Sequence, residues 1–491
     1  MVNALLAVAT ALLLFATFPP LNLQFLAPVG LTPLLLGVYR EREWWRRLLW
    51  GELAGMVYWG ATCYWIQGVL EHYGRMGLAG SLGVFALFCL IKGLHWAAYA
   101  ALAGPLMHRS YGVPAAAALW TGLERTHAPL GFPWLALGNA GIDMDLPMRL
   151  APLVGVYGLS FLFALIAATL AALLARKRRE QIAWLLPIPA LMALPHPPAP
   201  SQADREVVVL QPNIDPDQDW SGDTFQRIAS RLLYRSLVAA AAPEQSPPDL
   251  LVWPEVPAPF YYFTDPRFQQ ALNELAKAAS TPILAGTVAF TEKGEPLNSA
   301  VYISAKGEFL ARYDKNLLVP FGEFVPRYFA FVNKITKEAG DFVAGRQVVT
   351  VAVAGHRLGA FICYEAAFPH FVRQFARQGA EVLLNLSNDG YFGRSAARHQ
   401  HLLLARMRAA ENGRWLVRAT NDGITVAIDP AGRVRQMFPE YEEMAARLRF
   451  SYSKQITPYT RWGDWFAWTC LASGLFLAGS SLTWAVRRGR A

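Results

Sequence analysis

The chain has 491 residues, of which 54% are hydrophobic and only 16% are charged, whereas soluble domains carry about 25% charged residues. This composition excludes a single soluble globular domain. The net charge of +9 does not indicate nucleic-acid binding, because the basic residues lie mostly at the edges of apolar segments. Apolar residues are concentrated in the first 195 residues and the last 30. The sequence therefore predicts membrane helices over 1–195, a soluble domain over 196–463, and a last membrane helix and tail over 464–491.

Eight apolar segments are candidate membrane spans. They cover residues 3–18, 22–39, 48–70, 78–107, 113–139, 150–175, 181–195 and 464–486. The segment 181–195 is the weakest, because it is short and contains Pro187 and Pro189. The first segment has no basic region before it and no small-residue cleavage pattern after it, so it predicts a retained helix. Eight spans place both termini on the same side of the membrane.

The basic residues orient these spans. If the N-terminus is cytoplasmic, the short cytoplasmic segments contain Arg40, Arg42, Arg46, Arg47, Arg109, Arg176, Lys177, Arg178, Arg179, Arg487, Arg488 and Arg490. The opposite short loops contain little beyond Arg75 and Arg149. An excess of lysine and arginine marks the cytoplasmic side, so residues 196–463 are predicted to be extracytoplasmic. Loss of the span 181–195 would reverse this orientation.

Only one cysteine falls in the predicted soluble domain. Cys63, Cys89 and Cys470 lie within candidate spans, which leaves Cys363 alone. A disulfide framework is therefore not predicted there, and neither a metal-ligand spacing nor a nucleotide-binding glycine loop occurs in the sequence. A single thiol in an oxidising compartment is either buried as a structural residue or used chemically.

The soluble domain shows alternating strand and helix patterns. A proline-rich linker is predicted over 193–201. Strands are predicted at 206–214, 249–255, 282–290, 298–304, 307–315, 356–365, 381–389, 414–421 and 423–432. Helices are predicted at 224–242, 266–279 and 398–412, and a further helical pattern begins after Cys363. This alternation predicts an α/β domain.

Three polar residues follow apolar strands, where open α/β sheets place their ligands. Glu255 in VWPE is a candidate base, Lys315 in YDKN is a candidate oxyanion stabiliser, and Cys363 in ICYE is a candidate nucleophile. We expect the start of a helix and a nearby lysine to lower the pKa of the Cys363 thiol. Taken singly, residues of these types are more often a loop carboxylate, a surface lysine and a buried structural cysteine.

Their order along the chain resembles the Glu-Lys-Cys triad of the nitrilase superfamily. A fuller resemblance, over nearly the whole chain, is to the bacterial apolipoprotein N-acyltransferases, a membrane-embedded branch of that superfamily. It is carried by GFPWLALGN, GVYGLSF, VVVLQPNI, VWPE, YDKNLLVPFGEFVP, ICYE, SNDGYFG and ARMRAAENGRWLVRATNDG. The resemblance implies a membrane α-helical bundle of about eight spans joined to a nitrilase-like αββα sandwich.

The resemblance also implies roles for seven residues. Glu255 is implied as the base, Lys315 as the oxyanion stabiliser and Cys363 as the nucleophile. Supporting roles are implied for Glu323, which would assist the triad, for Tyr364 and Glu365, which would shape the thioester site, and for Trp220 on a mobile substrate-contacting arm. The chain departs from the family at Gly390 and Tyr391, where Ala and Trp are frequent, and this departure affects fine substrate contacts.

The implied reaction is a two-step acyl transfer without a cofactor. Cys363 would accept an acyl chain from a glycerophospholipid and pass it to the N-terminal α-amine of a diacylglyceryl-cysteine apolipoprotein. The implied location is the bacterial inner membrane, with the catalytic domain on the periplasmic side. Aromatic residues at 260–263 and 328–332 are candidates for loops that dip into the lipid interface, although ordinary packing explains them equally well.

Two other functions remain open from the residues themselves. The first is an amidase or nitrilase-type hydrolase that passes the acyl group to water, although a small soluble substrate gives no reason for membrane spans. The second is a transporter or scaffold whose exported domain binds a ligand without chemistry. Four ionisable residues inside candidate spans, namely Lys92, His95, Glu124 and Arg125, are costly in a membrane unless paired and are therefore further candidates for function.

Overall fold

The computed structural model describes residues 1–129, 131–176, 179–196, 203–241, 246–320, 322–324 and 342–487. Contacts divide the chain into two compact units. One unit consists of Met1–His196 together with Trp462–Ala491, and the other consists of Pro197–Arg461. The first unit is therefore assembled from both ends of the chain, and the second is inserted between them.

The first unit is entirely helical in its described residues. Its α-helices are α1 (Val2–Ala16), α2 (Thr32–Arg40), α3 (Trp44–Thr62), α4 (Trp65–His72), α5 (Gly77–Leu106), α6 (Gly112–Arg125), α7 (Asp145–Met148), α8 (Ala151–Val154), α9 (Val156–Leu174) and α15 (Trp465–Arg487). Its 3₁₀ segments are η1 (Gln24–Leu26), η2 (Leu137–Gly141), η3 (Arg179–Leu185) and η4 (Ile188–Ala193). Helix α14 (Pro458–Trp462) lies at the junction with the second unit.

Three helices in the described part of the chain are long and apolar enough to cross a membrane: Gly77–Leu106, Val156–Leu174 and Trp465–Thr483. Helix α1 is apolar but shorter. In the candidate span 113–139, the helix ends at Arg125. Pro129 lies four residues later, and a proline ring disfavours the helical conformation of the residue before it. The segment 181–195 forms 3₁₀ turns in place of an α-helix, since its prolines lack the amide hydrogens of a helical ladder.

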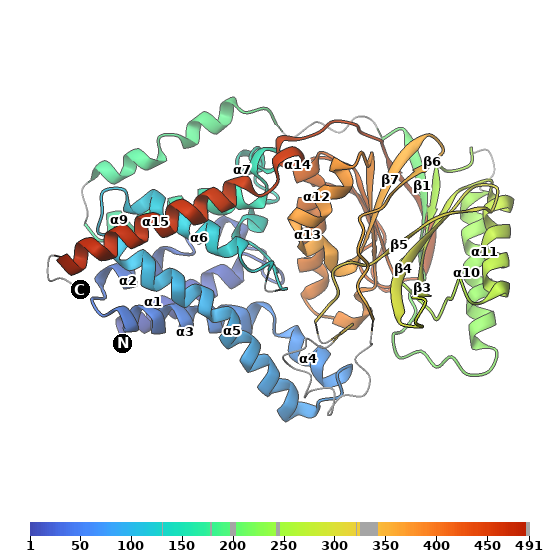
Figure 1. Cartoon of the computed structure of the whole chain (residues 1–491), viewed down its shortest axis with the longest axis horizontal. Coiled ribbons are helices and arrows are strands. Elements are labelled where there is room, and N and C mark those ends of the chain that lie inside the picture. The colour runs from blue at the N-terminus through green and yellow to red at the C-terminus, as the bar shows by residue number, and fades with distance from the viewer. Residues whose placement is uncertain are drawn as a thin grey trace. The chain divides into compact units, whose positions relative to one another are not determined.

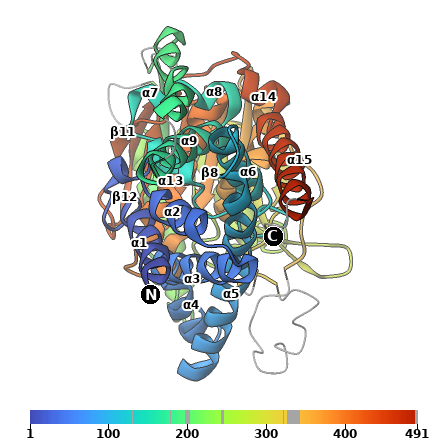
Figure 2. The ribbon, with the colours of Figure 1, turned by 90° about the vertical axis from the view of Figure 1, so that its left-hand side faces the viewer.

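Helix α6 is central to the packing of this unit. It lies between α9 and α15 in Figure 2 and contacts both. Gly122 allows the approach to α15, because a Cβ at this position would lie 2.4 Å from Cα of Leu471. Arg125 forms a buried ion pair with Asp464, directly before α15. Small residues that let helix backbones approach are typical of packing between membrane helices.

The other three ionisable candidates from the sequence, Lys92, His95 and Glu124, also have hydrogen-bond partners. Nζ of Lys92 donates to Nδ1 of His127 at 2.6 Å and to the Phe132 carbonyl oxygen at 2.8 Å. His95 lies 3.0 Å from the Thr126 hydroxyl. Glu124 accepts a hydrogen bond from the Leu137 backbone at 2.6 Å. Together with the Arg125 ion pair, these contacts lower the cost of burying polar groups in an apolar bundle.

The second unit contains two sheets, each with six strands among the described residues. The first has the order β12-β1-β2-β3-β4-β5 and the second the order β11-β10-β9-β8-β7-β6. The strands of the first sheet are β1 (Arg205–Gln211), β2 (Leu250–Val252), β3 (Ile283–Phe290), β4 (Pro296–Ile303), β5 (Phe309–Asp314) and β12 (Met444–Phe450). Those of the second are β6 (Thr350–Val353), β7 (His356–Ile362), β8 (Val382–Ser387), β9 (Leu416–Thr420), β10 (Val426–Ile428) and β11 (Val434–Met437).

Helices cover the outer faces of the two sheets. Helices α10 (Thr224–Ala240) and α11 (Pro266–Ala279) lie on one side, and α12 (Pro369–Arg377) and α13 (Ala397–Asn412) lie on the other, as Figure 1 shows. The order of layers is helix, sheet, sheet, helix. The nitrilase-like α/β fold predicted by the resemblance is therefore present, and strands such as β8 are buried along their whole length, as expected for strands covered on both faces.

Local sequence explains the position of α11. The side chain of Asp265 caps the helix by accepting from the Arg267 and Phe268 backbones at 3.0 and 3.3 Å, and Pro266 occupies the first turn. Ser280 ends the helix in a left-handed conformation with φ of 50°. These are ordinary start and stop signals of helices, and they explain why this helix was predictable to the residue.

Three strands and one helix were not predicted separately. Strands β6 and β11 have four residues each, and β12 carries the sequence MAARLRF, whose alanines and arginines have weak strand preference. Strand β12 forms because all seven of its residues pair antiparallel with β1. The helical pattern after Cys363 begins as a 3₁₀ turn, η6 (Cys363–Ala367), before α12 starts at Pro369.

The aromatic segment 260–263 is mainly part of the core. Phe260 and Tyr262 are buried, and the Phe260 ring stacks on Phe268 with centroids 4.5 Å apart. Tyr261 is exposed at the surface of the unit. Packing in the core of the unit therefore accounts for two of the four residues, Phe260 and Tyr262. The second aromatic segment, 328–332, lies outside the described residues, as do residues 197–201 of the predicted linker.

Candidate active site

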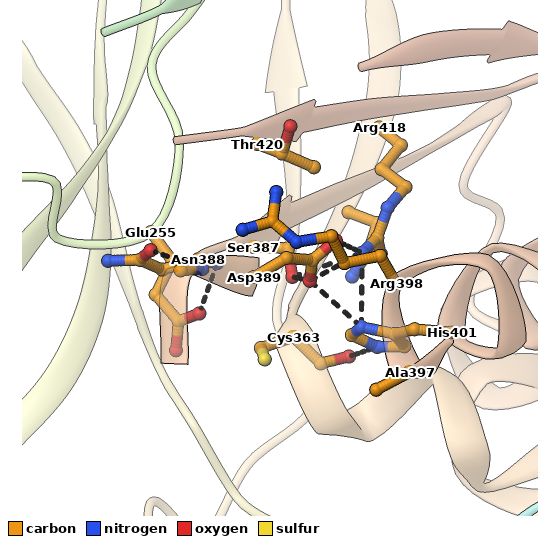
Figure 3. A network of polar contacts seen from close by, with 12 residues as sticks. Glu255, Cys363, Ser387, Asn388, Asp389, Ala397, Arg398, His401, Arg418 and Thr420 are labelled. Carbon is orange, nitrogen blue, oxygen red and sulfur yellow. Dashed lines mark hydrogen bonds and ion pairs between the residues drawn. The ribbon is translucent and has the colours of Figure 1, made fainter. Parts of the chain in front are cut away.

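The three predicted catalytic residues come together at the ends of three strands. Glu255 follows β2, Lys315 follows β5, and Cys363 follows β7. All three are buried, and the charges of Glu255 and Lys315 both act on the Cys363 thiol. Figure 3 shows the sulfur of Cys363 on the side of its loop that faces Glu255. Residues 108 positions apart in sequence therefore share one buried site.

Lys315 joins two carboxylates within this site. Its Nζ donates to Oε1 of Glu255 at 3.1 Å and to Oε1 of Glu323 at 2.9 Å. Asn298 on β4 spans the same pair, because its amide nitrogen donates to both oxygens at 2.8 Å. The second oxygen of Glu255 accepts from the Asn388 backbone at 2.8 Å. Glu255 is thus fixed by donors from both sheets, and Glu323 by donors from the first sheet and the segment after it.

The charges in this cluster do not cancel, since two carboxylates face one ammonium. Burial alone would lower the pKa of Lys315, but Glu255 and then Glu323 outweigh burial and hold this pKa well above its usual value. Lys315 is therefore a permanent cation. A fixed ammonium beside a nucleophile can stabilise the oxyanion that forms when an acyl carbonyl is attacked.

The Cys363 thiol differs from the sequence-based expectation. Burial, and after it the negative charge of Glu255, raise the pKa of Cys363 above its usual range, although Lys315 opposes this shift. The prediction of a lowered pKa was wrong because the thiol is buried and because the neighbouring carboxylates outnumber the lysine. In addition, a 3₁₀ turn and not a long helix follows the thiol directly. The resting thiol is protonated, so nucleophilic attack requires a base.

Cys363 also has an unusual backbone conformation. Its φ is +49°, in the left-handed region, which costs a non-glycine residue on the order of 1–2 kcal/mol. The carboxylate of Glu365, two residues later, helps to stabilise this turn. It accepts hydrogen bonds from the Ile362 and Asn316 backbones, both at 2.7 Å. One carboxylate therefore ties the segment before Cys363 to the segment after Lys315.

Burial raises the pKa of Glu365 to about 7. Besides the two backbone donors, the hydroxyl of Tyr313 donates to both of its oxygens, at 2.8 and 2.7 Å. These contacts make Glu365 a structural link between the two sheets at the site. Tyr364 is buried and packs edge-on against Phe368 with ring centroids 5.2 Å apart.

Trp220 occupies a different position from the triad. It is half-buried, packs against the core beside β1 and β2, and contacts the ring of Phe225 with centroids 6.4 Å apart. The structure thus joins Glu323 to the triad through a direct hydrogen bond with Lys315, and Glu365 through hydrogen bonds to the backbones next to Cys363 and Lys315. The contacts of Trp220 are with the core of its own unit.

The two residues that depart from the family pattern lie at the site. Burial of the Tyr391 hydroxyl, and after it the negative charges of Glu255 and Glu323, raise the pKa of Tyr391 to about 12. The residue as a whole is 48% exposed. A Cβ at Gly390 would lie 2.6 Å from Cγ of Pro216. An alanine at this position therefore requires movement of the 216 loop, which explains why glycine fits here.

Several site residues were not predicted from the sequence. Asn298 lies within an ordinary strand pattern, and only its contact with Glu255 and Glu323 reveals its role. Gly286 on β3 lets the base approach, because a Cβ there would lie 2.2 Å from the Pro254 carbonyl oxygen and 2.9 Å from Cα of Glu255. Such close approach is a frequent reason for glycine inside a strand. The glycine within this strand pattern is therefore the one feature of the sequence that could have indicated the contact.

Family comparisons agree with this architecture. Residues 220–455 match the carbon-nitrogen hydrolase family, and residues 10–169 match the apolipoprotein N-acyltransferase N-terminal domain. An amidase from Nesterenkonia sp. of known structure is 19% identical, covers 53% of this chain and 94% of its own, and superposes with a TM-score of 0.39. The class defined by fold and family match is thus a carbon-nitrogen hydrolase domain attached to a membrane-type helical unit.

Relatives narrow this class further. An apolipoprotein N-acyltransferase from Geobacter metallireducens is 35% identical, covering 96% of this chain and 94% of the relative. Another from Azotobacter vinelandii is 34% identical over 99% of this chain and 95% of the relative. The chain therefore belongs to the apolipoprotein N-acyltransferase family and is an N-acyltransferase, which confirms the family predicted from the sequence motifs.

Proposed function

We propose that the protein transfers an acyl chain from a glycerophospholipid to the N-terminal α-amine of a diacylglyceryl-cysteine apolipoprotein, through a thioester on Cys363. The observation that carries this proposal is a buried thiol on which the charges of one carboxylate and one permanent ammonium both act. The acceptor class follows from the names of the relatives, and the donor class follows from the membrane-type helices, since a lipid ester is the acyl source within reach of them.

In the first step, Glu255 takes the proton from the Cys363 sulfur as the sulfur attacks the ester carbonyl. The carbonyl oxygen becomes an oxyanion that faces the Lys315 ammonium. When the tetrahedral intermediate collapses, the bond to the glycerol oxygen breaks, and this oxygen receives the proton from Glu255. A thioester and a lysophospholipid result, and Glu255 is again ionised.

In the second step, the acceptor amine attacks the thioester carbonyl while Glu255 takes a proton from the nitrogen. Lys315 again faces the oxyanion. Collapse breaks the carbon–sulfur bond, and the sulfur recovers the proton, so the products are an amide and the resting thiol. Glu323 holds Lys315 in place, and Glu365 and Tyr364 hold the Cys363 turn. Trp220 is proposed to belong to an arm that contacts substrate, so its contacts would change when lipid binds.

The charge distribution supports a membrane topology. We propose eight spans in the bacterial inner membrane, with the segment 181–195 crossing as 3₁₀ turns, and the catalytic unit on the periplasmic side. The basic residues that flank the apolar segments and the apolar length of α5, α9 and α15 support this proposal. Exposed Lys306, in the turn between β4 and β5, offers a test. Lys306→Cys should react with a membrane-impermeant maleimide in cells whose outer membrane has been opened, and protection until lysis would contradict this orientation.

The thioester is the direct test of the function. Detergent-solubilised protein incubated with phospholipid should gain the mass of one acyl group, which hydroxylamine should remove. Peptide mapping should locate this group on Cys363, and a diacylglyceryl peptide should release it as an amide product. The proposal is wrong if wild type gains no mass, if Cys363→Ser gains the same hydroxylamine-sensitive group, or if the group passes mainly to water when the acceptor peptide is present.

A further inference from the structure

A buried polar network lies behind the nucleophile, on the side of Cys363 away from Glu255 (Figure 3). It consists of His401 on α13, Asp389 at the start of the 3₁₀ turn η7 (Asp389–Phe392), and Arg418 on β9. All three side chains are completely buried. Buried charged and imidazole groups are costly unless their contacts are well formed, so the arrangement of these contacts is informative.

Arg418 and Asp389 form the charged part of the network. Nη2 of Arg418 donates to the two carboxylate oxygens of Asp389 at 2.9 and 2.8 Å. The hydroxyl of Ser387 donates to the same carboxylate at 2.9 Å. Although burial alone would raise the pKa of Asp389, the Arg418 charge lowers it well below its usual range. This carboxylate is therefore ionised and neutralised by Arg418.

His401 connects this pair to the nucleophile. Its Nε2 lies 3.0 Å from the backbone carbonyl oxygen of Cys363. A carbonyl oxygen only accepts hydrogen bonds, so Nε2 carries the proton. Nδ1 lies 3.0 Å from Nη2 of Arg418 and 3.1 Å from Oδ1 of Asp389. Burial and the Arg418 charge lower the pKa of His401, so the imidazole is neutral and Nδ1 accepts from Arg418. Asp389 thus orients Arg418, Arg418 orients the imidazole, and the imidazole donates to Cys363.

The group that receives this hydrogen bond is under strain. Cys363 has φ of +49°, and the direction of its carbonyl is linked to the direction of its side chain through the backbone torsions. A donor fixed on this oxygen stabilises the left-handed conformation in which the sulfur faces Glu255. Released from the donor, the residue can relax toward an ordinary conformation and turn its sulfur away.

We propose that His401 is a positioning residue that holds the Cys363 carbonyl and thereby keeps the sulfur directed at the base and at the acyl carbonyl. This inference rests on the proposed role of Cys363 as the nucleophile. Loss of the hydrogen bond should lower the maximal rate of thioester formation about 100-fold, because a displacement of roughly 1 Å at reacting atoms has an effect of that size. The lipid concentration at half-maximal rate should stay within about twofold, since His401 lies behind the thiol.

Two variants separate positioning from packing. In His401→Gln, the amide nitrogen reaches the place of Nε2 and can donate to the Cys363 carbonyl. In His401→Asn, the shorter side chain can still accept from Arg418 but stops short of that carbonyl. His399→Gln is the matched control, since His399 is on the same helix with its side chain 52% exposed. Thermal unfolding of each purified variant reports whether it is folded.

The rate of acyl-group gain on Cys363 should be about 100-fold lower in His401→Asn, within about tenfold of wild type in His401→Gln, and unchanged in His399→Gln. Equal loss in both folded His401 variants, or wild-type rates in both, would overturn the inference. If His401→Asn does not fold, a 100-fold loss in folded His401→Gln overturns it, and a rate within tenfold supports it. A wild-type protein without any adduct would instead reject the proposed nucleophile, which is a distinguishable result.

Discussion

The two sheets of the catalytic unit contribute opposite kinds of chemistry to the site. The first sheet supplies Glu255, Lys315 and, through the segment after it, Glu323, a cluster with one negative charge in excess. The second sheet supplies Cys363 and behind it a charge-balanced pair of Asp389 and Arg418. The excess negative charge at the first sheet leaves a carboxylate that can accept a proton. The charge-balanced pair at the second sheet gives a rigid support for the nucleophile. Residues of the first sheet therefore transfer the proton, and residues of the second sheet orient the Cys363 nucleophile.

Removing the cation from the first sheet should have the largest effect. In Lys315→Met, Glu255 and Glu323 are left buried without their shared partner, and breaking a buried ion pair costs about 3–5 kcal/mol of stability. Thioester formation should also fall at least 10²- to 10³-fold, as when one oxyanion donor is lost. The thermal unfolding midpoint and the rate of acyl-group gain measure the two effects, with Lys306→Met, an exposed position, as the control.

A second substitution separates these two effects. Lys315→Met combined with Glu323→Gln removes one charge of each sign, so part of the lost stability should return while the acyl-transfer rate stays low. Recovery of activity together with stability would show that Lys315 only supports the fold. Such a result would contradict its assignment to the oxyanion.

Gly286→Ala should have the next largest effect, because it displaces the base without changing any charge. The new Cβ would lie 2.2 Å from the Pro254 carbonyl oxygen, so the Glu255 segment must move away from β3. We expect a loss of about 10- to 100-fold in thioester formation and a loss of about 1–3 kcal/mol in stability from overpacking. Gly83→Ala in α5 is the control, since nothing lies within 4 Å of its Cβ. Unchanged activity in Gly286→Ala would show that the position of Glu255 tolerates movement.

Gly390→Ala should have the smallest effect. This change introduces the residue frequent in the family, and its Cβ would contact Cγ of Pro216 at 2.6 Å. We expect a destabilisation of about 1 kcal/mol, at the low end of overpacking, with a small decrease in acyl-transfer rate. The double variant with Pro216→Ala should recover the unfolding midpoint. If the single variant is as stable and active as wild type, the loop around Pro216 moves without cost, and the structure does not require glycine at position 390.

The sequence predicted most of this catalytic unit because its strong elements carry local signals. Strands β1, β3 and β8 are apolar runs, and α11 has a capping aspartate and a proline in its first turn. Strand β12 was missed since its formation depends on pairing with β1 and not on its own residues. The candidate spans were less accurate, because hydropathy alone does not show that 181–195 forms 3₁₀ turns.

The triad was predictable through its position after strands and through the family motifs, and the residues that support it were not. Asn298 and His401 occur in unremarkable strand and helix patterns, and their roles depend on distances to residues 43 and 38 positions away. The direction of the thiol pKa shift was also beyond the sequence, since it depends on burial and on the number of carboxylates around one lysine.

The central claim is that Glu255 takes the thiol proton, and a paired measurement on Glu255→Gln tests it most directly. After burial, the Glu255 charge is the largest cause that raises the pKa of Cys363. Neutral glutamine removes this charge while Lys315 remains, so the thiol pKa should fall and alkylation of Cys363 by iodoacetamide at pH 8 should become faster. Acyl-group gain from phospholipid should instead become about 10²- to 10⁴-fold slower, because the general base is gone. If alkylation and acylation slow together, or if acylation keeps its wild-type rate, the account is contradicted.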